Sequence, residues 1–221
     1  MKLIGLVGFI GSGKGTFADT LVERHGFVKE SFANGVKDAT AVVFGWDRKL
    51  LEGDTDVSRI WREQPDAFWS KRFNKEFSPR LALQLMGTEA GRGVFHEDIW
   101  IHSLEKRLKE DKDYVIADVR FPNEIAAIRN MGGKVLRVKR GENPEWYLAA
   151  IDQNTKDNCK DMEQNYPSVH YSEWAWVGSA LDGVVDNNCN LENIPKRVDQ
   201  MLNLLYNSHV EANEVVYHEI V

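Results

Sequence analysis

Short apolar runs alternate with amphipathic segments along most of the chain. The apolar runs have the length of buried strands, and they lie at 3–7, 27–33, 114–118, 134–138 and 183–186. Apolar residues at helical spacing and helix start signals predict helices at 13–25, 36–44, 78–86, 98–109, 122–131 and 195–206. This alternation predicts an α/β fold with a doubly wound, mainly parallel five-stranded sheet, whose ligand crevice lies at the carboxyl ends of the strands.

Two stretches depart from this alternation. Residues 46–77 are rich in tryptophan and charge without clean periodicity, and residues 141–173 are polar and aromatic with weak periodicity. A chain of 221 residues can form one domain that carries a mobile insertion. We therefore interpret residues 1–221 as a single domain and residues 141–173 as a lid-like excursion from it.

Charge narrows the range of partners. The chain has 28 basic and 34 acidic residues, a formal net charge of −6, and no long run of lysine or arginine. Affinity for duplex nucleic acid comes mainly from neutralising phosphates, so we expect no duplex partner. Small phosphorylated ligands remain compatible with an acidic protein, because a few local cations can hold one.

The cysteines and the N-terminus predict a soluble cytoplasmic protein with no membrane partner. Cys159 and Cys189 have no metal-ligand spacing, which favours two reduced thiols over a disulfide or a zinc site. The first apolar stretch is broken by Gly5 and Gly8 and leads into Lys14, as is typical of a buried strand rather than a signal peptide. No stretch approaches the ~18 apolar residues of a membrane span.

The residues after the first predicted strand fit the phosphate-loop pattern G-x-x-x-x-G-K, from Gly8 to Lys14. Glycines let successive N–H groups curl around a phosphate, and the following helix presents its positive end. Lys14 can bridge the β- and γ-phosphates of ATP, and the Thr16 hydroxyl can face Mg²⁺. Because the pattern lies between a strand and a helix, it favours a nucleotide loop over a turn without a ligand. The residues expected at the nucleotide are Gly11, Ser12, Gly13, Lys14, Gly15 and Thr16.

Asp118 and Arg120 follow the third predicted strand, where the crevice is expected. In an extended chain both side chains point to the same side. Asp118 could hold Mg²⁺ through water, and Arg120 could bind a phosphate through two hydrogen bonds. A structural ion pair at the strand end is the alternative, and the position in the crevice favours the functional interpretation.

Phosphoryl transfer also needs groups that hold the acceptor. Arg80 and Gln84 lie one turn apart on an otherwise apolar helix, so they face either a polar ligand or solvent. The other acceptor candidates are Lys37, Thr88, Glu89 and Arg92.

A basic cluster of Arg137, Lys139 and Arg140 ends the fourth predicted strand, immediately before the excursion. The cluster could close over transferring phosphates, although Lys139 could equally be solvated at the sheet edge. His170, inside the excursion, has the pattern of an ordinary surface histidine.

Together these segments resemble the deoxynucleoside monophosphate kinases of tailed bacteriophages. The matching stretches, in one order along the chain, are GFIGSGKGTFAD (8–19), SFANGVKDA (31–39), SPRLALQLMGTEAGR (78–92), IADVRFPNEIAAIRNMGGKVLRVKR (116–140), HYSE (170–173) and VVDNNCNLENI (184–194). The resemblance implies a P-loop NTPase fold and the reaction ATP + dNMP → ADP + dNDP with Mg²⁺, in the host cytoplasm if a phage encodes the chain.

The resemblance also implies roles for single residues. Lys14, Asp118, Arg120 and Arg140 would act at the phosphates, and Asn187 would meet the adenine. Residues 46–93 would form the acceptor-nucleotide-binding region, although the tryptophan-rich part of it could instead form a homodimer surface.

Two alternatives remain open at this point. One is another small-metabolite kinase of the same fold, such as a dephospho-CoA or phosphomevalonate kinase. The other is a non-catalytic ATP-binding module, which would not need the many cations predicted at the crevice. The chain has no Asn-Lys-x-Asp guanine motif, which argues against a GTPase.

Overall fold

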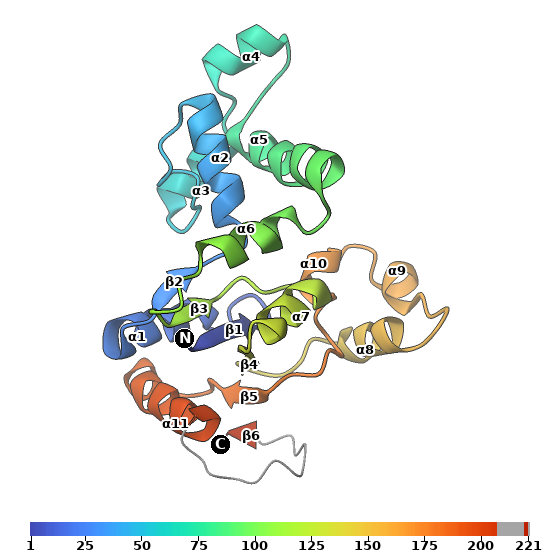
Figure 1. Cartoon of the computed structure of the whole chain (residues 1–221). Coiled ribbons are helices and arrows are strands. Elements are labelled where there is room, and N and C mark those ends of the chain that lie inside the picture. Colours follow the sequence, from blue (N-terminus) through green and yellow to red (C-terminus); the bar gives the residue numbers. More distant parts are fainter. Residues whose placement is uncertain (207–218, 221) are drawn as a thin grey trace. The chain divides into compact units, whose positions relative to one another are not determined.

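The computed structural model describes residues 1–206 and 219–220 and divides the chain into two compact units (Figure 1). Unit 1 comprises Met1–Glu30 and Lys109–Val221, and unit 2 comprises Ser31–Leu108. The sheet lies in unit 1, whereas unit 2 is built from helices. No helix within the described ranges is long and apolar enough to cross a membrane.

The sheet of unit 1 is parallel throughout, in the order β2-β3-β1-β4-β5-β6. Its strands are β1 (Leu3–Val7), β2 (Val28–Glu30), β3 (Tyr114–Ile116), β4 (Lys134–Lys139), β5 (Gly183–Asp186) and β6 (Glu219–Ile220). The five predicted strands are confirmed, although the second and the third are shorter than expected. The sixth strand was not predicted; residues 207–218 and 221 lie outside the described part.

Helices cover both faces of the sheet because β1 is apolar at every position. Ile4 and Leu6 pack in one core with α1 (Lys14–His25) and α11 (Ile194–Tyr206). Gly5 points to the opposite face, where a Cβ atom would lie 2.5 Å from Ile128 of α7 (Pro122–Asn130). This doubly wound arrangement is the predicted one, and it places the ends of β1, β3 and β4 beside one another.

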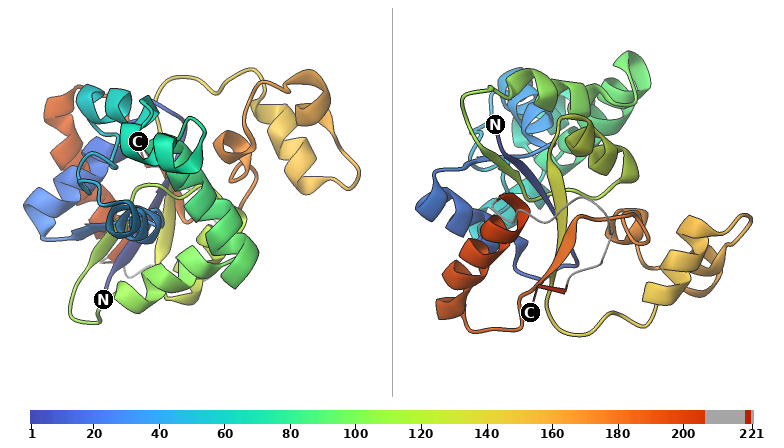
Figure 2. Two further views of the ribbon diagram at one scale, coloured as in Figure 1. Left: turned by 90° about the horizontal axis from the view of Figure 1, so that it is seen from above. Right: turned by 60° about the horizontal axis from the view of Figure 1, so that its bottom comes forward.

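The excursion between β4 and β5 is largely helical. It contains α8 (Tyr147–Thr155), α9 (Asp161–Asn165) and α10 (Tyr171–Trp174), and η2 (Leu191–Asn193) follows β5. Figure 2 shows α8 and α9 beside the sheet rather than over either of its faces. The Asn154 side chain ties α8 to the segment after α10 by donating hydrogen bonds to the carbonyl oxygens of Trp174 (3.0 Å) and Val177 (2.7 Å).

Unit 2 packs around aromatic side chains. Its helices are α2 (Asn34–Phe44), α3 (Asp56–Glu63), α4 (Ala67–Phe73), α5 (Pro79–Leu85), η1 (Met86–Phe95) and α6 (Ile99–Arg107). Trp46 and Phe77 both contact Phe44, at centroid distances of 4.8 and 5.3 Å, and Trp69 meets the same ring edge-on at 5.2 Å. The tryptophan-rich stretch thus supplies much of the core of unit 2.

The helix expected to end near Met86 continues as the π-helix η1 to Phe95. Gly91 explains the close packing against α6, since a Cβ atom there would lie 2.4 Å from the Trp100 ring. The Trp100 indole N–H donates to the Gly87 carbonyl oxygen at 2.8 Å, which satisfies a carbonyl group of the widened helix.

Candidate active site

The phosphate loop between β1 and α1 has the backbone that its glycines predict. Gly8, Gly11 and Gly13 all have positive φ angles, of 146°, 81° and 92°, a region that side chains with a Cβ atom rarely adopt. At Gly8 a Cβ atom would also lie 2.4 Å from the Val138 carbonyl oxygen. The loop therefore needs glycine for its shape and for its close approach to β4.

Lys14 reaches back over this loop. Its ammonium group donates hydrogen bonds to the carbonyl oxygens of Gly8 (2.6 Å) and Phe9 (3.1 Å). Burial lowers the pKa of Lys14 most, the positive charge of Arg120 lowers it further, and Glu173 raises it. The ammonium group thus lies between a second cation and a carboxylate at the mouth of the loop.

A pocket at the carboxyl ends of β1 and β3 brings together three of the residues predicted at the phosphates. Lys14, Asp118 and Arg120 line it, with Gly8 and Ile10 of the loop. Lys14 and Arg120 supply positive charge and Asp118 a carboxylate, so the pocket combines groups for phosphate oxygens with an oxygen ligand for a cation.

The opposite wall of this pocket comes from the excursion, and sequence reasoning had given its residues no role. Ser172, Glu173 and Trp176 line the pocket. Arg120 donates a hydrogen bond to the Ser172 hydroxyl at 3.3 Å and lies 3.7 Å from the Glu173 carboxylate. The matching stretch 170–173 was the only sequence signal for Ser172 and Glu173, and Trp176 had none, because nothing local links these residues to a loop more than 150 positions away.

Glu124 is a second residue that sequence reasoning missed. It is buried in the first turn of α7, and its carboxylate accepts the main-chain N–H groups of Arg120 (2.8 Å) and Phe121 (3.1 Å). A glutamate at this helix position commonly bonds back to the residues before the helix. It fixes the backbone that carries Arg120 into the pocket.

Asn187 lies beneath the phosphate loop. Its side chain donates to the Ser12 carbonyl oxygen at 2.8 Å, and only 4% of the residue is exposed. The main-chain N–H of Asn187 donates to the Lys139 carbonyl oxygen at 2.7 Å. The structure thus gives Asn187 a supporting contact with the loop, while its predicted contact with adenine stays a prediction.

The basic cluster at the end of β4 divides between the interior and solvent. Arg140 is exposed and does not line the pocket, so its catalytic role stays a prediction. Arg137 is buried instead, with its guanidinium 5.2 Å from the ring centroids of Phe9 and Trp176 and its Nη1 2.9 Å from the Tyr147 hydroxyl. Arg137 therefore connects the phosphate loop to the excursion.

Gly11 is exposed in the loop, Gly15 and Thr16 are exposed at the start of α1, and Ser12 is buried. The Ser12 hydroxyl has no hydrogen-bond partner among the described residues. A loop that keeps glycines on its open side and a buried hydroxyl within it fits the predicted cradle for phosphate groups.

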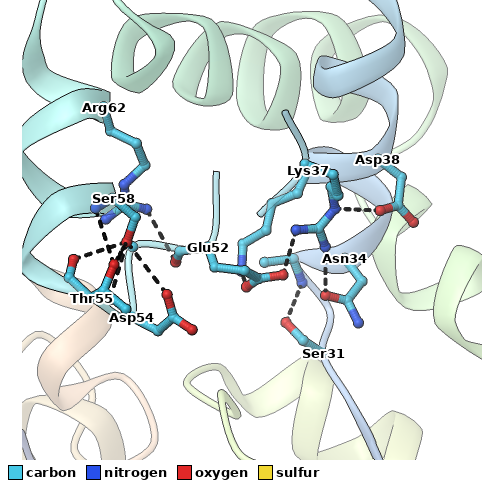
Figure 3. Close-up of polar contacts among 12 residues, drawn as sticks. Ser31, Asn34, Lys37, Asp38, Glu52, Asp54, Thr55, Ser58 and Arg62 are labelled. Atoms are coloured by element: carbon cyan, nitrogen blue, oxygen red, sulfur yellow. Dashed lines mark hydrogen bonds and ion pairs between the residues drawn. The ribbon is translucent and has the colours of Figure 1, made fainter. Parts of the chain in front are cut away.

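In unit 2, Lys37 belongs to an ion-pair network (Figure 3). Its ammonium group lies 2.6 Å from Glu52, and Arg48 bonds to the same carboxylate and, at 2.5 Å, to Asp38. Arg62 donates to the Glu52 carbonyl oxygen at 3.5 Å. Burial, followed by the positive charge of Arg80, lowers the pKa of Arg62. Arg62 is a cation near Arg80 that sequence reasoning had not selected.

The remaining acceptor candidates are exposed on α5 and η1. They are Arg80, Gln84, Thr88, Glu89 and Arg92. Arg80 has a side chain 60% exposed and lies 4.0 Å from Glu63 of α3. An ion pair this long and this exposed leaves the guanidinium available to another anion.

Comparison with known proteins decides the family. The family model for deoxynucleotide monophosphate kinase matches residues 52–155. A protein of Acanthamoeba polyphaga mimivirus named as a deoxynucleotide monophosphate kinase is 32% identical, with the match covering 63% of this chain and 75% of that protein. The chain belongs to the deoxynucleotide monophosphate kinase family. The deoxynucleoside-5'-monophosphate kinase of Escherichia phage T5 is 30% identical, over 58% of this chain and 71% of the phage protein.

Family membership confirms the resemblance seen in the sequence, and it makes the chain a nucleotide-using kinase of the P-loop type. The shikimate kinase of Aquifex aeolicus overlaps 94% of this chain and 98% of its own, with 15% identity and a TM-score of 0.41. A structural likeness this loose says nothing about the chemistry of this kinase.

Proposed function

We propose that this chain transfers the γ-phosphoryl group of ATP to a deoxynucleoside monophosphate and releases ADP and dNDP. The observation that carries the proposal is the pocket in which Lys14, Asp118 and Arg120 meet at the end of the phosphate loop. Family membership supports the nature of the acceptor, since the relatives are named for deoxynucleotide monophosphates.

The protein would take little covalent part in this reaction. The acceptor is itself a phosphate oxyanion, so no general base is needed, and catalysis consists of positioning and charge stabilisation. Loop N–H groups would bind the ATP phosphates with Gly11, Ser12, Gly13, Gly15 and Thr16. Lys14 and Arg120 would neutralise the charge that develops on the transferring group. Arg140, directly after β4, would help to neutralise this charge.

The oxygen donors at the pocket fit Mg²⁺. Asp118 lines the pocket and the Thr16 hydroxyl is exposed at the start of α1; carboxylates, hydroxyls and water are the ligands that Mg²⁺ takes. Thr16 and Asp118 would hold the ion, Asp118 through water. When bound, Mg²⁺ neutralises phosphate charge.

Unit 2 would hold the acceptor, with residues 46–93 as its binding region. The candidates are Lys37, Arg80, Gln84, Thr88, Glu89 and Arg92, to which we add Arg62. The positive charge of Arg80 lowers the pKa of Arg62, so the two guanidinium groups repel one another. The negative charge of an acceptor phosphate would offset this repulsion.

The test is ADP formation from Mg-ATP with dAMP, dGMP, dCMP, dTMP, the ribonucleotides, dephospho-CoA and phosphomevalonate, supplied one at a time to the full chain. Turnover that depends on one or a few dNMPs is the expected result, and it names the base. Turnover only with dephospho-CoA or phosphomevalonate would show that the chain is another small-metabolite kinase of the same fold. ATP binding without any turnover would support the non-catalytic module.

A further inference from the structure

Two imidazoles and a carboxylate gather where η1 ends and α6 begins. His96 follows η1, Asp98 precedes α6, and His102 lies in the first turn of that helix. One ligand atom from each of the three side chains lies within 4.8 Å of the other two. The ring centroids of His96 and His102 are 5.4 Å apart. These three residues have no part in the phosphate pocket described above.

The hydrogen bond of His102 favours metal ligation, whereas the hydrogen bond of His96 would be exchanged for the ion. His102 Nδ1 lies 3.1 Å from a Glu105 carboxylate oxygen, so Nδ1 donates its proton there and Nε2 carries a lone pair. A carboxylate behind a histidine ligand fixes its tautomer and raises its basicity. His96 Nδ1 accepts the Asp98 main-chain N–H at 3.0 Å, so it also carries a lone pair, which an ion would take in exchange for this hydrogen bond.

The three ligand atoms can come close enough to bind one ion without any repacking of the core. Metal–ligand bonds of about 2.0–2.1 Å in a tetrahedral site hold ligand atoms roughly 3.3 Å apart. The three ligand atoms therefore have to approach one another by at most about 1.5 Å from their present separation. Both histidines are exposed, so rotation of their side chains can supply this movement without disturbing a core.

We propose that His96, Asp98 and His102 bind one divalent transition-metal ion of the Zn²⁺ class, with Glu105 as a positioning residue behind His102. Two imidazoles with a carboxylate suit Zn²⁺, Co²⁺, Ni²⁺ and Cu²⁺, whereas Mg²⁺ prefers oxygen ligands. The ion ties the end of η1, the helix that carries Arg92, to the start of α6. This site is distinct from the site proposed for the Mg²⁺ of the reaction. The metal-site proposal does not depend on the proposed kinase activity.

The experiment uses the full chain, stripped of metal with a chelator and exchanged into metal-free buffer. Zn²⁺ affinity is measured by competition with a chromophoric chelator, and Co²⁺ is added separately to record the visible spectrum of its coordination. We expect one ion per chain. His96→Ala and His102→Gln each weaken Zn²⁺ binding by more than tenfold, and Glu105→Gln weakens it by about 10–100-fold, the usual effect of losing such a partner.

His25→Ala is the matched control, because His25 lies in unit 1 and pairs with Asp199 at 2.8 Å. It should leave the Zn²⁺ affinity and the Co²⁺ spectrum unchanged. Far-UV circular dichroism establishes that each variant is folded. Zn²⁺ affinities of His96→Ala and His102→Gln within about threefold of the unmodified chain would overturn the proposal, since a true ligand contributes far more than that. So would a chain that binds no Zn²⁺ in the competition assay.

Discussion

Asn187 donates a hydrogen bond of 2.8 Å from its buried side-chain amide to the main-chain carbonyl oxygen of Ser12. The two residues are 175 positions apart, and the bond joins the end of β5 to the phosphate loop. The same amide leaves no room for a side chain at Gly13, where a Cβ atom would lie 2.3 Å from its nitrogen. The shape of the loop thus depends on a residue from the other end of the chain.

Asn187→Asp should damage the loop while keeping the size of the side chain. A carboxylate oxygen would replace the donor and face the Ser12 carbonyl oxygen, leaving a buried acceptor without its hydrogen bond at a cost of about 1–3 kcal/mol. We expect a lower free energy of unfolding in urea and a raised KM for ATP. Asn190→Asp, at an exposed position without a side-chain cap bond, should change neither; equal losses in both variants would show that added charge alone is responsible.

Lys14→Ala should lower kcat by about 10²-fold to 10³-fold or more, because the lost group stabilises charge in the transition state. The fold should survive, since the side-chain hydrogen bonds of Lys14 within the described residues go to two loop carbonyl groups. Steady-state kinetics with Mg-ATP and the preferred acceptor give the comparison. Lys29→Ala, which removes a solvent-exposed pair with Asp19, is the control. Near-normal turnover of the Lys14 variant would contradict the phosphate-loop mechanism.

Glu124→Ala tests how Arg120 is held. Loss of the carboxylate leaves the N–H groups of Arg120 and Phe121 without their acceptor, so the Arg120 backbone should move and kcat should fall by about 10-fold to 10²-fold, as positional errors of about 1 Å do. A merely structural role would lower stability without this loss of kcat at a temperature where the variant is fully folded. Measuring kcat and KM separately, beside a urea titration, distinguishes the two.

The alternation of strands and helices, the phosphate loop and the Asp118–Arg120 pair were readable in the sequence because each depends on neighbours within one element. The helices α3 and α4 were missed because they have only eight and seven residues, which is shorter than the window over which helical periodicity can be recognised. Their start signals were present, since Thr55 and Ser58 form a capping box and Asp66 caps α4. Glu173 and the loop contact of Asn187 could not be derived, because they depend on tertiary packing between distant segments.

The last prediction concerns the alkaline limb of the pH–rate profile. Lys14 must be protonated to stabilise phosphate charge, so kcat/KM for ATP should fall as the pH rises through the pKa of Lys14 in the free enzyme. Burial and Arg120 lower this pKa, and Glu173 raises it. In Glu173→Gln the raising influence is lost, so the pKa of Lys14 decreases further and the alkaline limb should move to lower pH.

The measurement is kcat/KM for ATP from about pH 7 to about pH 10, a range that spans the titration of a lysine with a lowered pKa. Glu145→Gln, at an exposed position of the excursion, removes the same charge away from the pocket and should leave the limb in place. A limb that stays fixed in Glu173→Gln, or moves to higher pH, would contradict the electrostatic coupling between Glu173 and Lys14. A limb that moves down in Glu173→Gln alone would support Lys14 as the titrating group, because Glu173 raises the pKa of Lys14.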